Sequence, residues 1–243
     1  MDDRLLEGQL AYYRARAAEY DEWFLRKGRH DRGPEWNRRW FSELEHVRLE
    51  LERFGPTGKV LELACGTGLW TVELARHAAG ITAVDAAPEV LEINRARLVE
   101  TRTEIPIRYV RADLFDWSPD DAYDVVFLGF WLSHVPPGRF VALWDLVRSA
   151  LRPGGRAFFV DSLGQEAPAE KRRLGWKPGD HTMLRRLNDG REFRIVKIFY
   201  DPVELQARLA DLGWRFSVRT TKDHLLYGFG APRFLNPPST PVP

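Results

Sequence analysis

Residues 60–70, VLELACGTGLW, decide the fold class of this chain. The aliphatic run at the start predicts a short buried strand, and the amphipathic run that follows predicts a helix. Between them, Gly66 and Gly68 allow the backbone to turn tightly and to approach a ligand closely. Two glycines alone are also compatible with a plain turn. Other parts of the sequence are therefore needed to predict whether this turn binds a ligand.

Strands and helices alternate on the C-terminal side of this turn. Strands are predicted at 59–65, 81–86, 107–113, 123–130 and 155–162, with helices at 69–78, 88–100 and 136–154. This alternation is typical of a parallel sheet with helices on both faces. The predicted fold class is therefore α/β.

Helices predicted at 5–26 and 34–54 precede the α/β region, and a less regular segment follows it. That segment contains a hairpin with Asn188-Asp189-Gly190 at its turn, a helix capped by Asp201 and a final pair of strands. We expect an N-terminal helical lid and substrate cap at 1–56, an α/β domain at 57–235 with an insert at about 162–192, and a disordered tail at 236–243.

Composition and charge exclude several classes of partner. The 243 residues are 44% hydrophobic and 29% charged, as in a globular protein, and the net charge is +1. This balance gives no electrostatic reason to expect a nucleic acid or an anionic membrane surface as partner. One cysteine, Cys65, predicts a reducing, cytoplasmic location, and no apolar run is long enough for a membrane span.

Acidic residues end the two predicted strands that follow the glycine turn. Asp85 ends the second strand and Asp113 the third. Since the carboxyl ends of parallel strands share one edge of the sheet, these residues and the turn should lie together. An acid at the end of the second strand is placed to accept hydrogen bonds from a ribose diol. The combination predicts a nucleoside site.

The glycine pattern discriminates between nucleotides. A dinucleotide site has the pattern G-x-G-x-x-G, whose third glycine is replaced here by Thr71. The segment from Glu62 to Gly68 instead resembles the E/D-x-G/A-x-G-x-G motif of class I S-adenosylmethionine-dependent methyltransferases, with Ala64 at a position that is often glycine. The segments RADLFDW, at 111–117, and LRPGGRAFFVDS, at 151–162, also resemble that family, and the spacing of Tyr12, Tyr13, Tyr20 and Asp21 resembles ubiquinone/menaquinone-type small-molecule methyltransferases.

The resemblance implies a fold, a cofactor and a set of site residues. The fold is a Rossmann-like seven-stranded sheet with helices on both faces and an antiparallel last strand, under an N-terminal helical lid. The cofactor is S-adenosyl-L-methionine, and no metal is expected. The implied cofactor-binding residues are Tyr20, Glu62, Ala64, Gly66, Thr67, Gly68, Asp85, Ala86, Asp113, Leu114 and Gly129.

The acceptor side is predicted from residues after the fourth strand. His134 is the candidate general base, because an imidazole titrates near neutral pH, although it could instead pack at the start of the next helix. An aromatic wall for an apolar or planar small-molecule acceptor is a hypothesis for Tyr13, Trp23, Trp36, Trp40 and Trp131; simple packing onto the sheet is the alternative.

Basic runs and isolated histidines complete the set of candidates. The runs at 170–176 and 184–187 are expected to be solvated faces, with an anionic group of the substrate as the alternative. His30 and His181 are expected to face solvent.

Three functions compete on these residues. The first is a small-molecule methyltransferase. The second is a nicotinamide-dependent oxidoreductase, which the missing third glycine disfavours. The third is a non-catalytic protein that binds S-adenosylmethionine.

Overall fold

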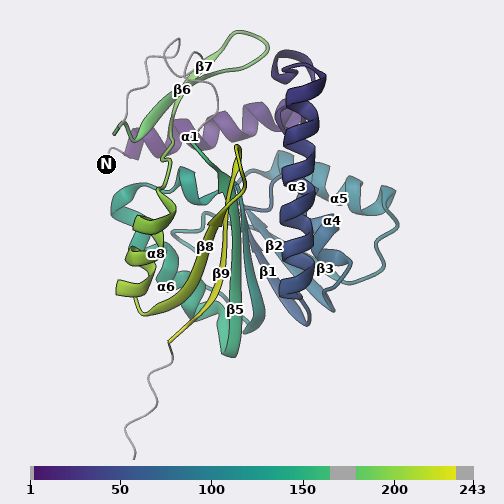
Figure 1. Ribbon diagram of the computed structural model, residues 1–243. Helices are drawn as coiled ribbons and strands as arrows, with labels where there is room; N and C mark the ends of the chain where they lie inside the picture. The colour runs from purple at the N-terminus through teal and green to yellow at the C-terminus, as the bar shows by residue number, and fades with distance from the viewer. Residues whose placement is uncertain (1–2, 165–178, 234–243) are drawn as a thin grey trace, which may run out of the picture.

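The computed structural model describes residues 3–164 and 179–233, and seven strands in these ranges form one mixed sheet (Figure 1). The strand order is β3-β2-β1-β4-β5-β9-β8, while β6 and β7 form a separate hairpin. The strands are β1 (Lys59–Leu63), β2 (Gly80–Asp85), β3 (Ile107–Arg111), β4 (Tyr123–Gly129), β5 (Leu151–Ser162), β6 (Thr182–Arg186), β7 (Glu192–Val196), β8 (Trp214–Thr220) and β9 (Leu225–Pro232).

The strand order reverses between β1 and β4, which pair in parallel. In open α/β sheets this reversal opens a crevice at the carboxyl ends of the strands, where ligands bind. The last strand, β9, pairs antiparallel with β5, as predicted. The sheet thus has the predicted seven strands, and its topology places the glycine turn after β1 at the crevice.

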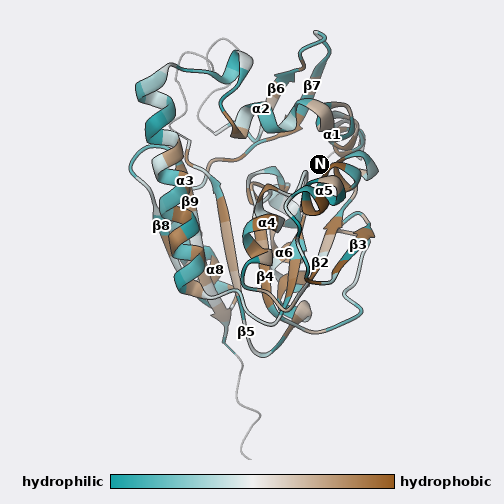
Figure 2. Cartoon of the chain, turned by 90° about the vertical axis from the view of Figure 1, so that its right-hand side faces the viewer, coloured by the Kyte–Doolittle hydropathy of each residue, from teal (hydrophilic) through white to brown (hydrophobic). Residues whose placement is uncertain are grey.

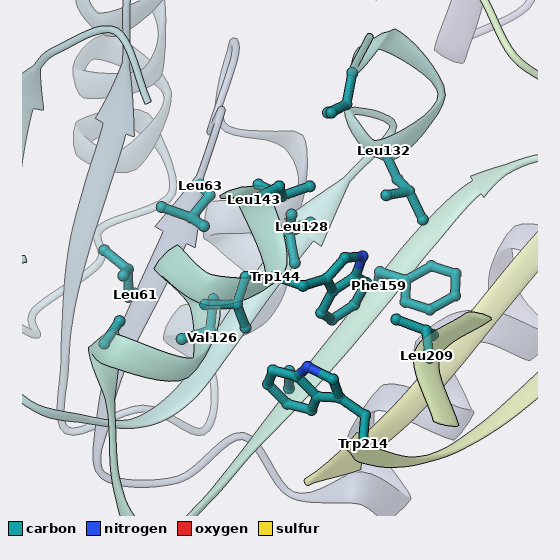
Figure 3. Packing of buried hydrophobic residues seen from close by; sticks show 14 of the residues in the cluster. Leu61, Leu63, Val126, Leu128, Leu132, Leu143, Trp144, Phe159, Leu209 and Trp214 are labelled. Atoms are coloured by element: carbon teal, nitrogen blue, oxygen red, sulfur yellow. The ribbon is translucent and has the colours of Figure 1, made fainter. Parts of the chain in front are cut away.

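Side chains alternate between two cores, one on each face of the sheet. Val126 and Leu128 pack against α6 (Phe140–Ala150) and α8 (Pro202–Asp211), as Figure 3 shows for part of this cluster. Val125 and Phe127, their neighbours on β4, pack on the other face against α3 (Pro34–Phe54) and α4 (Leu69–Ala75). Figure 2 shows hydrophobic colour in the central strands between these layers.

The predicted helix at 5–26 is wrong as one continuous element. The structure has α1 (Asp3–Arg16), a 3-10 turn at Ala17–Glu19 and α2 (Tyr20–Phe24). Ala17 packs against Ala87 and Val90, beside α5 (Pro88–Glu100), so tertiary contacts bend the segment at Ala17–Glu19, where the sequence has no proline or glycine to break a helix. We call α1, the 3-10 turn and α2 the cap.

The predicted helix at 136–154 is shorter in the structure. Helix α6 ends at Ala150, and β5 begins at Leu151, whose ψ of 133° is extended. Pro153 sets a limit on this helix, because a proline disfavours helical geometry in the residue before it, here Arg152, and the helix ends two residues before Arg152.

The cap lies across the carboxyl-end edge of the sheet together with the β6–β7 hairpin, which packs on α1 (Figure 1). The hairpin, the Asp201 cap of α8 and the β8–β9 pair are confirmed. Helix α3 falls within the predicted 1–56 cap but packs against the sheet. The domain boundaries stay predictions, and both the 236–243 tail and the 170–176 basic run lie outside the described residues.

A search of the described residues found no helix long and apolar enough to cross a membrane.

Candidate active site

The glycine turn adopts backbone conformations that favour glycine at three positions. Ala64, Gly66 and Gly68 have φ values of 53°, 54° and 87°. A residue with a side chain is strained in the left-handed region, which gives a physical reason why glycine is common at the position of Ala64 in this motif. The turn ends at Gly68, the residue that precedes α4.

The two glycines of the turn have different roles. Gly66 donates its N–H to Asp85 Oδ2 at 3.0 Å and lines a cavity. Gly68 does not line the cavities described below; a Cβ at this position would lie 2.7 Å from Asn94 Oδ1. Gly68 therefore permits close packing of the turn against α5, whereas Gly66 leaves room for a ligand.

The first cavity, which we call the glycine-turn cavity, lies between the strand ends and the cap. Its lining includes eight predicted cofactor residues: Tyr20, Ala64, Gly66, Asp85, Ala86, Asp113, Leu114 and Gly129. The cap adds Leu6, Gln9, Leu10 and Tyr13, which sequence reasoning did not assign to the cofactor. The structure thus brings the ends of four neighbouring strands to one cavity.

Asp85 is the central acid of this cavity. Its Oδ1 accepts from the Ala87 amide at 2.9 Å, in addition to the Gly66 bond. Burial raises the pKa of Asp85 to about 6, and the amides of Ala87 and Gly66 act in the opposite direction. The carboxylate is therefore ionised at neutral pH, as an acceptor for a ribose diol needs to be.

Glu62 and Thr67 line a third cavity next to the first. Glu62 is buried and accepts from Thr71 Oγ1 at 2.6 Å; burial raises its pKa to about 8, so it is largely protonated at neutral pH. Thr67 donates to Asp21 Oδ1 at 2.6 Å, and Arg97 both pairs with Asp21 and donates to the Thr67 carbonyl at 2.8 Å. These bonds connect α2 of the cap to the glycine turn.

The second cavity is basic, has a volume of about 250 Å³ and adjoins the first. Seven of its lining residues carry basic nitrogens: Arg16, Arg29, His30, His134, Arg185, Arg186 and Lys197. Among the described residues that line it there is no Asp or Glu. We call it the basic cavity.

Two arginines of the basic cavity have no acidic partner among the described residues. Arg16, at the end of α1, contacts the rings of Tyr12 and Tyr20, and its Nε is buried without a hydrogen bond. Arg185 lies on β6, and its side chain makes no ion pair or hydrogen bond within the described ranges. Unpaired buried or half-buried cations are costly, so this arrangement is typical of an anion site.

Lys197 forms the buried floor of the basic cavity. Its Nζ donates to Ser133 Oγ and Ser162 Oγ, both at 2.7 Å, and lies 3.5 Å from Asp161 Oδ1. This network fixes the loop after β4 against β5. Sequence reasoning missed Lys197 and Arg16, because no local pattern indicates a shared cavity. For the run that contains Arg185, it gave an anionic group of the substrate as the alternative to a solvated face.

His134 lines the basic cavity, and its side chain is 8% exposed. The ring Nδ1 lies 2.8 Å from the Val196 carbonyl, which requires a proton on Nδ1 and leaves Nε2 as the acceptor. Burial, and next the charge of Lys197, hold the pKa of His134 well below its usual value. The backbone carbonyl of His134 accepts from Gln9 of α1 at 3.0 Å.

Two expectations about basic residues are corrected. His30 is half-buried rather than a simple solvent-facing residue: it lines the basic cavity, and burial lowers its pKa to about 3. The run at 184–187 is not only a solvated face, since Arg185 and Arg186 line the same cavity. His181 is exposed, as predicted.

The predicted aromatic wall is partly wrong. Tyr13 lines the glycine-turn cavity and the basic cavity, Trp23 lines the basic cavity and Trp131 lines the glycine-turn cavity. Trp36 and Trp40 do not line the three cavities; they stack on each other with ring centres 6.4 Å apart. Trp40 is fully buried in the core, where it packs under the guanidinium of Arg26.

A group of possible metal ligands lies away from these cavities. Side-chain ligand atoms of Glu43, Asp223 and His224 lie within 4.8 Å of one another. The Glu43 carboxylate, however, already accepts from the amides of Asp223 and His224, at 3.0 and 2.8 Å, and from the Thr221 hydroxyl. Its role in the structure is to hold the β8–β9 turn against α3.

Comparison with known proteins identifies the family. A family model described as "Methyltransferase domain" matches residues 60–155. The ubiquinone biosynthesis O-methyltransferase of Xanthomonas euvesicatoria pv. vesicatoria is 30% identical over 170 residues, which are 70% of this chain and 67% of that protein. The carboxy-S-adenosyl-L-methionine synthase of Aeromonas salmonicida is 36% identical over 104 residues, covering 41% of this chain and 42% of that protein.

A solved structure extends the similarity to nearly the whole chain. The structure named "DhpI-SAM-HEP complex" matches with a TM-score of 0.76 and 39% identity, and covers 96% of this chain and 100% of that chain.

The chain belongs to the class I S-adenosylmethionine-dependent methyltransferases. It is a methyltransferase of small molecules, with S-adenosylmethionine as the methyl donor. The nicotinamide-dependent alternative has no support from these comparisons.

Proposed function

We propose that this methyltransferase acts on a small acceptor with an anionic group, which binds in the basic cavity next to the methyl donor. The observation that carries the proposal is the lining of that cavity by several cations and, within the described residues, no carboxylate. Arg16 and Arg185 are the main anchors, because neither has an acidic partner among the described residues. Their guanidinium groups can bind a carboxylate or phosphate in two-point geometry.

The predicted cofactor residues that line the glycine-turn cavity fit the donor. Asp85 would accept from the ribose hydroxyls, and Asp113 and Leu114 would contact the adenine. The carbonyls of Ala64 and Gly129 would accept from the amino group of the donor, and amides from Gly66 to Gly68, with Tyr20, would meet its carboxylate. The positions of Asp85, Ala86 and Gly66 around one cavity support this assignment; Glu62 and Thr67 would act from the third cavity.

The protein would catalyse the transfer mainly by alignment. The bound donor supplies a methyl group on a sulfonium: the S–CH₃ bond breaks, its electron pair stays on sulfur, and the acceptor atom bonds to the methyl. Holding the two reactants in line contributes about 7–11 kcal/mol, so no nucleophilic side chain is needed. The cap excludes water, since α1 residues such as Leu6, Leu10 and Tyr13 close the glycine-turn cavity.

His134 is the proposed general base for an acceptor whose nucleophilic atom carries a proton. Its neutral Nε2 is available because Nδ1 is committed to Val196. The lowered pKa keeps the imidazole unprotonated at neutral pH, although it also makes the group a weaker base. The apolar or aromatic part of an acceptor would pack against Tyr13 and Trp131. A cytoplasmic location is proposed only from the single cysteine.

Calorimetry can test the proposed acceptor class without knowledge of the acceptor. S-adenosylhomocysteine should bind alone, nicotinamide nucleotides should not, and inorganic phosphate should then bind to the S-adenosylhomocysteine complex. Arg185→Ala should weaken phosphate binding about tenfold or more, because a hydrogen bond to a charged group contributes about 1.5–3 kcal/mol.

Arg194→Ala is the matched control for Arg185→Ala. Arg194 lies on the same hairpin, is exposed, donates to Thr182 and lines none of the three cavities. It should leave the phosphate affinity unchanged. Absence of phosphate binding to the wild-type complex, or equal binding by Arg185→Ala, would show that the acceptor is not held as an anion.

A further inference from the structure

Tyr20 lies where all three cavities meet. Tyr20 and Phe130 both line the glycine-turn cavity, the basic cavity and the third cavity. Phe130 follows β4 with a φ of 55°, a strained conformation of the kind that clusters at functional sites. With the donor in the glycine-turn cavity and the acceptor in the basic cavity, both reactants would lie next to these two rings.

The Tyr20 hydroxyl is the polar group at this junction, since Phe130 offers none. It makes no hydrogen bond with any described residue. The neighbouring Tyr13 differs, because its hydroxyl oxygen is buried away from solvent and has no partner in the described structure. Tyr13 and Tyr20 both line the glycine-turn cavity and the basic cavity. Of these two tyrosines, Tyr20 is the one whose hydroxyl a ligand can reach.

A contact of its ring and the bonds of the next residue hold Tyr20 in place. The Arg16 guanidinium carbon lies 4.7 Å from the ring centre. The next residue, Asp21, is bound to Thr67 and Arg97 and so attaches the start of α2 to the glycine turn. An anion on Arg16 would therefore lie beside the Tyr20 ring. Burial raises the pKa of Tyr20 to about 12, so the hydroxyl keeps its proton at neutral pH and can donate.

We infer that Tyr20 is a catalytic residue whose hydroxyl donates a hydrogen bond to the anionic group of the acceptor and orients it toward the donor. This inference rests on the proposed anionic acceptor, and it assigns the Tyr20 hydroxyl to the acceptor in place of the donor carboxylate. Arg16 and Arg185 supply the attraction, and the Tyr20 hydroxyl supplies direction, because a hydrogen bond is strong only over a narrow range of angles.

The test compares Tyr20→Phe with the wild type in two calorimetric titrations. Phenylalanine keeps the ring and its contact with Arg16, so the fold should be retained, which thermal unfolding checks. We expect the affinity of the S-adenosylhomocysteine complex for inorganic phosphate to fall about tenfold. The affinity for S-adenosylhomocysteine in the absence of phosphate should change less than about threefold, because this inference assigns the Tyr20 hydroxyl to the acceptor and leaves the donor carboxylate to the amides from Gly66 to Gly68.

Tyr200→Phe is the matched control. The Tyr200 hydroxyl is also without a partner in the described structure, but it packs beside Phe140, outside the three cavities. Both affinities should stay at the wild-type value in this variant.

Each other outcome overturns a defined part of the proposal. If Tyr20→Phe binds S-adenosylhomocysteine more weakly but phosphate as well as the wild type does, Tyr20 contacts the donor and not the acceptor. If neither affinity changes, the Tyr20 hydroxyl binds neither ligand. These results leave the anionic acceptor intact. Failure of the wild-type complex to bind phosphate would instead refute the anionic acceptor, and this inference with it.

Discussion

The glycine-turn cavity and the basic cavity share Tyr20 and Phe130, but their charged side chains differ in whether the protein itself supplies a partner. In the first, Asp85 and Asp113 accept from nearby backbone amides, at 2.9 to 3.0 Å. In the second, Arg16 and Arg185 have no compensating carboxylate within the described structure. Carboxylates that accept hydrogen bonds from the backbone are stabilised before a ligand binds. Arginines without an acidic partner are stabilised by a bound anion.

The two cavities also differ in how they are assembled. The acids and glycines of the first cavity all lie at the carboxyl ends of parallel strands of one sheet. The cations of the second come from the cap, the 3-10 turn Gly28–His30, the β6–β7 hairpin and Lys197 after it. This difference predicts that mutations can affect donor and acceptor binding separately.

Loss of Asp85 should have the largest effect. Asp85→Ala removes the acceptor for the ribose hydroxyls and should weaken S-adenosylhomocysteine binding by roughly a thousandfold, because two hydrogen bonds to a charged group contribute about 1.5–3 kcal/mol each. Calorimetry measures the change, with thermal unfolding as the check on folding. An affinity close to that of the wild type would disprove the ribose assignment and with it the contrast between the cavities.

Loss of His134 should have an intermediate effect, on rate rather than on donor binding. His134→Ala should lower the rate of methyl transfer roughly a hundredfold for an acceptor whose nucleophilic atom carries a proton. The measurement is the turnover number with saturating donor, on an acceptor found by a screen of small anions. S-adenosylhomocysteine affinity should be unchanged. If the variant turns over like the wild type, His134 is a packing residue.

Replacement of Glu62 should have the smallest effect at neutral pH. A carboxyl whose pKa is raised to about 8 in the folded protein, from about 4.3 when unfolded, binds more protons in the folded state between these values. The stability of the wild type therefore falls as the pH rises through this window, and Glu62→Gln has no such dependence.

The melting temperature of Glu62→Gln, relative to that of the wild type, measures this dependence. The melting temperature of the variant should be within a few degrees of that of the wild type near pH 7. As the pH rises to about 8, the melting temperature of the variant should increase relative to that of the wild type. A difference that does not change with pH would mean that Glu62 is ionised throughout, and the third cavity would then carry a charge.

Local patterns predicted most of the fold correctly. The apolar alternation, the glycine turn and Asp201 before Pro202 each depend on residues that are neighbours in sequence, and the structure confirms the elements they predict. The single helix at 5–26 failed because Ala17 packs against Ala87, a contact between distant segments that no local pattern encodes. Sequence patterns thus predicted structure that depends on neighbouring residues, and they failed where a contact between residues far apart in the sequence decided the structure.

The two cavities differ in the same way, since the residues of the glycine-turn cavity could be predicted from sequence and most of those of the basic cavity could not. Ala64, Gly66 and Asp85 could be assigned from sequence, since left-handed turns and strand ends restrict the residues that can occupy them. His30 and Arg185 were expected at the surface, because a loop histidine and a basic run usually are exposed. The hairpin packing on α1 instead encloses them with Arg16.

The sequence by itself determined the parallel sheet, the glycine turn and the acids at the strand ends, because local conformation requires particular residues at these positions. Only the tertiary structure decided that Arg16, Arg185 and Lys197 meet in one cavity beside Tyr20. Charges from separate elements act on a common ligand only once the cap and the hairpin fold over the sheet, and their attraction for an anion depends on that arrangement.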